Sequence, residues 1–258
     1  MVFSRKFRYL FIEVPLTGSW TIHLELCKRY GGEAILHKHA SYQEFVHSGY
    51  FKEISSLFAF ATIRNPLDEA VSRYFKYRSD HKGVFSNPNS MVAFRADYAD
   101  LEKFQYIQKT GADFSAFFLR YYRWPYSNML DYFPKHLSYL MRFEQLQTDF
   151  NSVLSRLCIE PEGDLPRRNK TDDRDENWKP YYSSAAIERA KKVMAPFMAQ
   201  WGYHFPKEWG DYQPRKLENL EYRALNQIRM LYSVNARYKD NVLARQLRRL
   251  MLLYSRNK

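Results

Sequence analysis

Two short turns in the sequence combine residue types that bind anions. The first, at residues 15–21 ("PLTGSWT"), follows an apolar run and precedes a helical pattern. Backbone N–H groups at a helix N-terminus have no partner within the helix, and the helix dipole favours negative charge there. Gly18 lets the backbone approach a phosphate closely, and Thr17, Ser19 and Thr21 add hydroxyl donors. The turn therefore predicts an anion site, with an ordinary strand-to-helix turn capped by serine as the alternative.

The second turn places a cation and a hydroxyl in a similar position. Arg64 follows the apolar run 57–63, and Ser72 lies about two helical turns after Pro66. An arginine at a strand end and a hydroxyl on the next helix form a compact phosphate clamp, although Arg64 alone fits a structural ion pair equally well. If both turns follow parallel strands of one sheet, they lie side by side at its carboxyl edge, where ligands bind.

The elements that must position these turns follow the order of an α/β fold. Apolar runs and helical spacing predict three strands and four helices, at 7–14, 19–30, 57–63, from about 67, 137–143, 144–157 and 183–201. A helix is also expected after Ser41, where Glu44 completes a capping-box pattern. We expect a three-layer, P-loop-like α/β domain with a central parallel sheet over residues 1–210, and a basic, amphipathic helical extension over 211–258.

The composition is that of a folded, basic protein. Of the 258 residues, 45% are hydrophobic and 17% aromatic, which excludes a disordered chain, and the net charge of +12 predicts anionic partners. Residues 214–258 hold eleven Lys and Arg against three Asp and Glu. Two amphipathic helices are expected there, suited to a membrane surface, a partner helix, an acidic polymer or the main domain itself. Nucleic acid is not an expected partner, because no helix-turn-helix, RNP or zinc pattern is present.

The cysteine content and the hydropathy of the chain indicate its cellular compartment. Cys27 and Cys158 are too few and too far apart for a disulfide framework. The chain has no apolar run of about 20 residues and no recognisable secretion signal at its start. We therefore expect a cytoplasmic protein whose basic helices allow contact with the inner membrane face. Spacings typical of metal sites are absent, so no metal is expected.

Longer stretches around both turns resemble one enzyme family. "FIEVPLTGSWTI" (11–22) resembles the 5′-phosphosulfate loop of sulfotransferases, and "FATIRNPLDEAVSRY" (60–74) is similar to their 3′-phosphate motif. Further stretches at 141–159, 165–171 and 181–203 resemble the branch of the family that modifies carbohydrates. The resemblance covers roughly residues 5–206, and its second motif is more specific than its first.

The resemblance implies a donor, a reaction and a set of binding residues. The donor is 3′-phosphoadenosine 5′-phosphosulfate (PAPS), whose sulfuryl group passes in line to an acceptor hydroxyl or amine. We expect an acceptor hydroxyl on a glycan or glycolipid. By position, the first turn holds the 5′ end, Arg64 and Ser72 hold the 3′-phosphate, and Lys170 closes over the nucleotide from a polar loop. The residues of the first turn are Thr17, Gly18, Ser19, Trp20 and Thr21.

Leu16 departs from the family pattern. Most members carry a lysine here, which neutralises charge on the bridging oxygen as the sulfuryl group leaves. Preorganised charge of this kind contributes roughly 10²–10³ in rate. Either another cation takes the role, which we favour, or the protein binds the nucleotide without turnover. A third alternative is a basic protein that binds polyanions or membrane surfaces through its C-terminal extension.

The stretch "LHKHAS" supplies candidates for the missing groups. A neutral imidazole is a suitable base for an acceptor hydroxyl, and we assign this role to His39, with His37 as the alternate. Lys38 is the candidate replacement for the lysine absent at Leu16. The alternative is that one of these histidines only caps the following helix. His23, on the first predicted helix, is interpreted as a packing residue.

Overall fold

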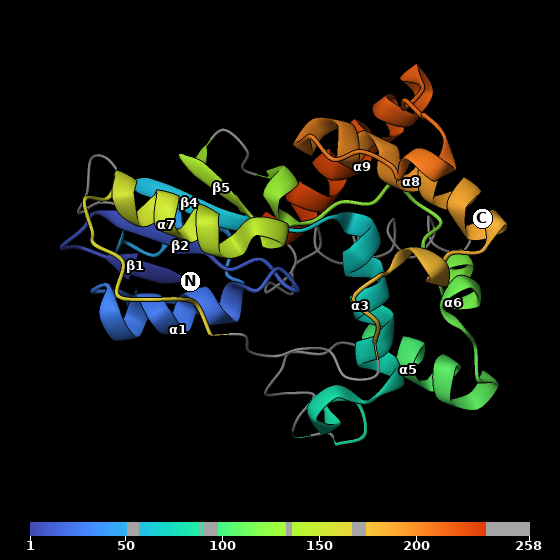
Figure 1. The fold of residues 1–258 in the computed structure, drawn as a ribbon, viewed down its shortest axis with the longest axis horizontal. Coiled ribbons are helices and arrows are strands. Elements are labelled where there is room, and N and C mark those ends of the chain that lie inside the picture. Colours follow the sequence, from blue (N-terminus) through green and yellow to red (C-terminus); the bar gives the residue numbers. More distant parts are fainter. Residues whose placement is uncertain (51–56, 88, 90–97, 133–135, 167–173, 236–258) are drawn as a thin grey trace. The chain divides into compact units, whose positions relative to one another are not determined.

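The computed structural model describes residues 1–50, 57–87, 89, 98–132, 136–166 and 174–235 (Figure 1). The chain forms two compact units. Unit 1 comprises Met1–Arg64, Ser127–Arg168 and Asn219–Lys258, and unit 2 comprises Asn65–Tyr126 and Asn169–Glu218. The domain boundary expected at residue 210 stays a prediction.

Among the described residues, unit 1 contains a five-stranded sheet in the order β3-β1-β2-β4-β5, flanked by helices. The strands are β1 (Val2–Ser4), β2 (Tyr9–Ile12), β3 (Glu33–Ala34), β4 (Phe58–Ile63) and β5 (Tyr139–Arg142). β2, β4 and β5 run parallel, as predicted, but β1 is antiparallel to both β2 and β3. The predicted parallel sheet is thus confirmed for these three strands, and the sheet as a whole is mixed. The sheet is mixed because a tight turn at residues 5–8, with Arg8 at φ 55°, folds β1 back onto β2.

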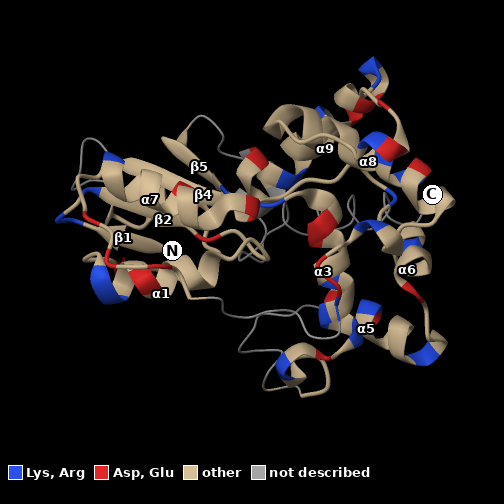
Figure 2. Ribbon diagram, viewed as in Figure 1, with Lys and Arg blue, Asp and Glu red and all other residues tan. Residues whose placement is uncertain are grey.

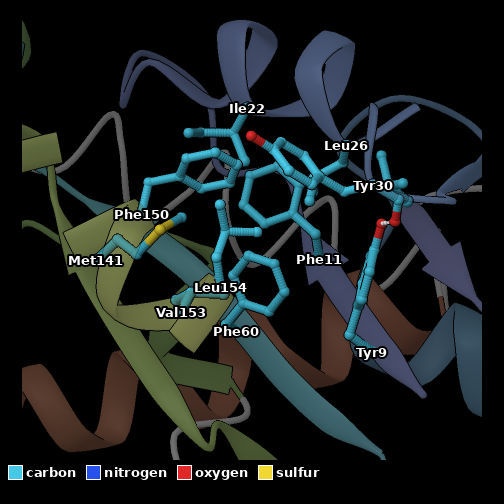
Figure 3. Packing of buried hydrophobic residues seen from close by; sticks show 11 residues of the cluster. Tyr9, Phe11, Ile22, Leu26, Tyr30, Phe60, Met141, Phe150, Val153 and Leu154 are labelled. Carbon is cyan, nitrogen blue, oxygen red and sulfur yellow. Dashed lines mark hydrogen bonds between the residues drawn. The ribbon is translucent and has the colours of Figure 1, made fainter. Parts of the chain in front are cut away.

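Two helices, α1 (Ser19–Arg29) and α7 (Leu146–Arg156), pack on the same face of this sheet (Figure 3). Phe11 pairs with Phe60 in the parallel register, and their ring centroids are 5.1 Å apart. Tyr30, just after α1, contacts Phe150 of α7 with ring centroids 5.6 Å apart. The buried cluster on this face comprises Val2, Tyr9, Phe11, Ile22, Leu26, Tyr30, Phe60, Met141, Phe150, Val153 and Leu154. This packing anchors β2 and α1, and so holds both ends of the turn between them.

The opposite face of the sheet is covered in part by a short helix, α2 (Tyr42–His47). Phe3 of β1 lies on this face, and its ring is 5.9 Å from that of Phe45. The predicted capping box is confirmed: Ser41 accepts from the backbone N–H of Glu44, whose carboxylate accepts from the Ser41 N–H at 2.7 Å. Unit 1 also contains single 3₁₀ turns at Met129–Tyr132 and Phe143–Gln145.

Unit 2 is built from helices. They are α3 (Pro66–Arg78), α5 (Tyr98–Thr110), α6 (Phe114–Tyr121) and α8 (Ser184–Trp201), with 3₁₀ turns at His81–Gly83, Lys179–Tyr181 and Lys207–Trp209. Tyr74 of α3 contacts Phe114 and Phe117 of α6. Tyr182 donates a hydrogen bond to the Leu67 carbonyl at 2.9 Å. These contacts fix α3, and with it Ser72, in the core of unit 2.

The helix α9 (Lys216–Asn235) confirms the first of the two helices predicted for the C-terminal extension. Basic and acidic residues are interspersed along α8 and α9 (Figure 2). Most of the positive charge of the extension, and the whole second predicted helix, fall in residues 236–258, outside the described residues. Over the described part of the chain, no helix combines the length and the hydropathy needed to cross a membrane.

Phe60→Ala should destabilise unit 1 strongly. Phe60 is fully buried at the centre of the cluster between β4, α1 and α7, so truncation leaves a cavity. We expect a loss of about 3–5 kcal/mol of unfolding free energy in urea denaturation. Val46→Ala, at an exposed position of α2, is the matched control and should change stability by less than about 0.5 kcal/mol. Equal stability of the two variants would contradict the assignment of Phe60 to the core.

Candidate functional site

The hydroxyl groups of the first turn are used within unit 1. Thr17 Oγ1 and Ser19 Oγ both donate to the Val14 carbonyl at 2.8 Å. Thr17 Oγ1 also lies 2.5 Å from Thr62 Oγ1 on the neighbouring strand β4. Two of the predicted hydroxyl donors therefore shape the turn, and backbone N–H groups are what it can offer to an anion.

The N-terminus of α1 fits an anion. Its N-cap residue, Gly18, is left-handed at φ 74° and makes no side-chain hydrogen bond to the first helical turn, which begins with Ser19 and Trp20. Such N–H groups, together with the helix dipole, attract negative charge. A Cβ at position 18 would lie 2.9 Å from Leu146 Cδ2 and 3.1 Å from Phe143 Cδ2. Glycine is therefore required here both by its backbone angle and by the space available.

A buried guanidinium lies at the same turn. Arg64, directly after β4 and 7% exposed, donates from Nη1 to the Leu16 carbonyl at 3.0 Å. Its guanidinium also lies 4.1 Å from the centre of the Phe143 ring. Leu16 itself is left-handed at φ 64°, a strained conformation for a residue other than glycine. The backbone of Leu16 is thus bonded to a buried cation.

His39 has the properties of a neutral base. Its Nδ1 lies 2.8 Å from the Glu13 carbonyl, and because a carbonyl only accepts, Nδ1 carries the proton and Nε2 the lone pair. Burial outweighs this hydrogen bond and lowers the pKa of His39 from its usual 6.5 to about 4. The imidazole is therefore neutral at pH 7. Its hydrogen bond to the Glu13 carbonyl holds the ring near the start of the first turn.

His37 and Lys38 have different surroundings. His37 Nε2 lies 2.6 Å from Glu44 Oε1, so this imidazole joins the capping box of α2, in line with the alternative that one histidine of the stretch serves the cap. The Lys38 ammonium lies 4.6 Å from the ring centre of Trp20, in the first turn of α1. Lys38 is thus a second cation beside the anion-binding end of this helix.

The second predicted turn lies in unit 2 apart from Arg64, which belongs to unit 1. Ser72 is buried on α3, and its hydroxyl accepts a hydrogen bond from Arg174 Nη1. Arg174 Nη2 also pairs with the Asp68 carboxylate. Lys170 lies outside the described residues.

Sequence reasoning did not single out Arg174 or Glu13. Arg174 sits in the polar stretch "RNKTDDRDE", which resembles a solvated run of charges. Glu13 is the one acidic residue in the largely apolar stretch 7–14 before the turn. This isolated charge is the feature of the sequence that could have identified it. An acid enclosed by apolar neighbours must be paired, and such pairs are frequent at functional sites.

Comparisons of the sequence with protein-family models, with curated proteins and with solved structures give no significant match. Within the described residues, no group of three or more His, Cys, Asp or Glu side chains is arranged to hold a metal ion. The motifs and the geometry within each unit are therefore what indicates a function.

His39 should make stability depend on pH between about 6.5 and 4. Since its folded pKa is lowered, the unfolded chain binds the proton more tightly, and the stabilisation that is complete above pH 6.5 is lost as the pH falls to about 4. His39→Asn keeps a residue that tolerates the left-handed backbone, φ 63°, but cannot titrate. Its melting temperature should fall less over this interval than that of the wild type. His47→Asn, on the exposed side of α2, should follow the wild-type curve.

Proposed function

We propose that this protein is a sulfotransferase that moves the sulfuryl group of PAPS to a hydroxyl of a glycan or glycolipid. The observation that carries the proposal is one end of unit 1, where a helix N-terminus without a side-chain cap, a buried arginine and a neutral histidine meet at a single turn. The resemblance of residues 11–22 and 60–74 to the two nucleotide-binding motifs points to the same chemistry. A P-loop-like domain and a cytoplasmic location are part of this proposal.

Each group at the turn has a role in this reaction. PAPS supplies an activated sulfuryl group on an anhydride to phosphate. The N–H groups of residues 18–20 bind the 5′ end of the nucleotide, because the Thr17 and Ser19 hydroxyls and the Thr21 N–H are bonded within the turn. His39 Nε2 accepts the proton of the acceptor hydroxyl. The resemblance also assigns Ser72 to the 3′-phosphate, and this assignment stays a prediction.

The cation that compensates for Leu16 has two candidates at this turn. Lys38, over Trp20, is the residue favoured by the sequence. Arg64 is the second, because its guanidinium bonds to the Leu16 backbone, which supports a role at the 5′ end as the alternative to the 3′-phosphate. The buried Arg64 guanidinium is held in place before the nucleotide binds, which favours electrostatic stabilisation of a leaving group.

Two alternatives remain distinct from this proposal. A nucleotide-binding pseudoenzyme is favoured by Leu16 itself, because the backbone of the turn is complete without the lysine. A basic protein that binds polyanions or a membrane surface is favoured by the charge of residues 214–258. Retention of polyanion binding by the full chain after loss of all nucleotide binding would support the last of these.

Arg64→Ala tests the binding role of the arginine. We expect it to weaken binding of adenosine 3′,5′-bisphosphate by about 2–3 kcal/mol, because a charge-assisted hydrogen bond to the 3′-phosphate is lost. Calorimetry with adenosine 5′-phosphate should show little change. Arg156→Ala, which removes an exposed arginine of α7 in the same unit, is the control and should bind both nucleotides normally. Equal losses for both nucleotides would move Arg64 to the 5′ end and contradict the 3′ assignment.

Incubation with ³⁵S-labelled PAPS and a panel of glycans and glycolipids tests the proposed reaction. We expect transfer by the wild type and a change of less than about tenfold in Leu16→Lys, because cations already serve the leaving group. His39→Ala should lose at least about 10²-fold, the usual scale for removal of a general base. A wild type that binds PAPS without transfer, and gains activity only as Leu16→Lys, would instead establish the pseudoenzyme.

A further inference from the structure

Glu13 contacts two imidazoles of unit 1 through different groups. Its carboxylate oxygen Oε1 lies 3.0 Å from His23 Nδ1, and its backbone carbonyl lies 2.8 Å from His39 Nδ1. An ionised carboxylate and a carbonyl only accept hydrogen bonds, so both Nδ1 atoms carry protons. Glu13, directly after β2, therefore binds the Nδ1–H of both rings. The Nε2 atom of each ring is left for other partners.

The carboxylate of Glu13 is charged and fully buried. Burial alone would raise its pKa, but the hydrogen bond from His23 and the charge of the Met1 amino group outweigh burial and lower the pKa to about 2. Its second oxygen, Oε2, has no hydrogen-bond partner among the described residues. A buried carboxylate that is only partly satisfied is costly, and such groups are concentrated at functional sites.

His23 lies beside the anion-binding end of α1. Its ring stacks on Trp20, with centroids 4.8 Å apart and planes inclined by 24°. The Lys38 ammonium lies over the same indole. The side chain of His23 is 15% exposed, so the imidazole can reach a ligand while its Nδ1 stays on the buried carboxylate.

We infer that His23, held by Glu13, supplies positive charge to the phosphate of the departing nucleotide, and that Glu13 is the positioning residue for both imidazoles. This inference rests on the proposed function and deepens it. In the step, a bond forms between the acceptor oxygen and sulfur while the bond from sulfur to the phosphate oxygen breaks. The acceptor proton passes to His39 Nε2, and the negative charge that develops on the phosphate is met by the N–H of His23 Nε2.

The two imidazoles then act in opposite protonation states. His39 must be neutral to accept a proton, whereas His23 must be protonated to supply charge. The charged groups around this pair are the Glu13 carboxylate, the Met1 amino group and, across Trp20, the Lys38 ammonium. Transfer should therefore rise with pH as His39 loses its proton.

The experiment uses the full chain labelled with ¹⁵N in histidine and in the backbone, titrated with adenosine 3′,5′-bisphosphate. The nucleotide should shift the ¹⁵N resonance of His23 Nε2, because the phosphate accepts a hydrogen bond from this nitrogen. Glu13→Gln should change the Nδ1–H signature of His23, because the charged acceptor is lost. His23→Gln should lower kcat at least about tenfold, with a smaller change in KM.

Two matched variants separate these effects from general damage. Glu25→Gln removes a buried carboxylate of α1 that is paired with Arg29, and His47→Gln removes an imidazole of α2. Both should leave the His23 signals and the pH profile unchanged. If amides 18–20 respond to the bisphosphate while His23 does not, the inference fails and the proposed function stands. If neither responds, the proposed function fails, and the inference fails with it.

Discussion

The parallel pairing of β2 with β4 determines where the reactive groups of unit 1 lie. Phe11 packs on Phe60 in this register, so the two strands end at the same edge of the sheet. Glu13 follows the first strand and Arg64 the second, and both therefore stand next to one turn. Since α1 packs on the same hydrophobic cluster, its N-terminus is fixed at that edge as well. The apolar contact between Phe11 and Phe60 thus positions the charged residues Glu13 and Arg64 at the turn.

The turn between β2 and α1 is built by backbone strain and internal hydrogen bonds. Leu16 and Gly18 both have positive φ angles, although only one of them is glycine. Thr17 and Ser19 bind the Val14 carbonyl, and Arg64 binds that of Leu16. Because carbonyl groups are occupied by these donors, they do not repel an approaching anion. The strain and the pairing are consistent with a turn shaped for binding rather than for stability.

Elements with a local signal were predictable from the sequence. The strand at Phe58–Ile63, the helix after it and the capping box at Ser41 each follow from residue types a few positions apart. The antiparallel strand β1 was missed because its three residues carry no periodicity of their own. The roles of Glu13 and Arg174 depend on partners distant in sequence, which no local pattern reveals. His23 was interpreted as a packing residue, since only the fold brings the buried carboxylate to its ring.

The ends of the sheet have a consequence for the behaviour of the protein at high concentration. Within the described residues, the edge strands of the sheet are β3, which has two residues, and β5, which has four. Glu33 of β3 pairs with Arg5, and the Arg156 guanidinium covers Tyr139 of β5. Short strands and edge charges prevent the open backbone of one molecule from extending the sheet of another. Unit 1 can therefore keep a largely apolar pair of central strands, β2 and β4, while resisting aggregation through its edges.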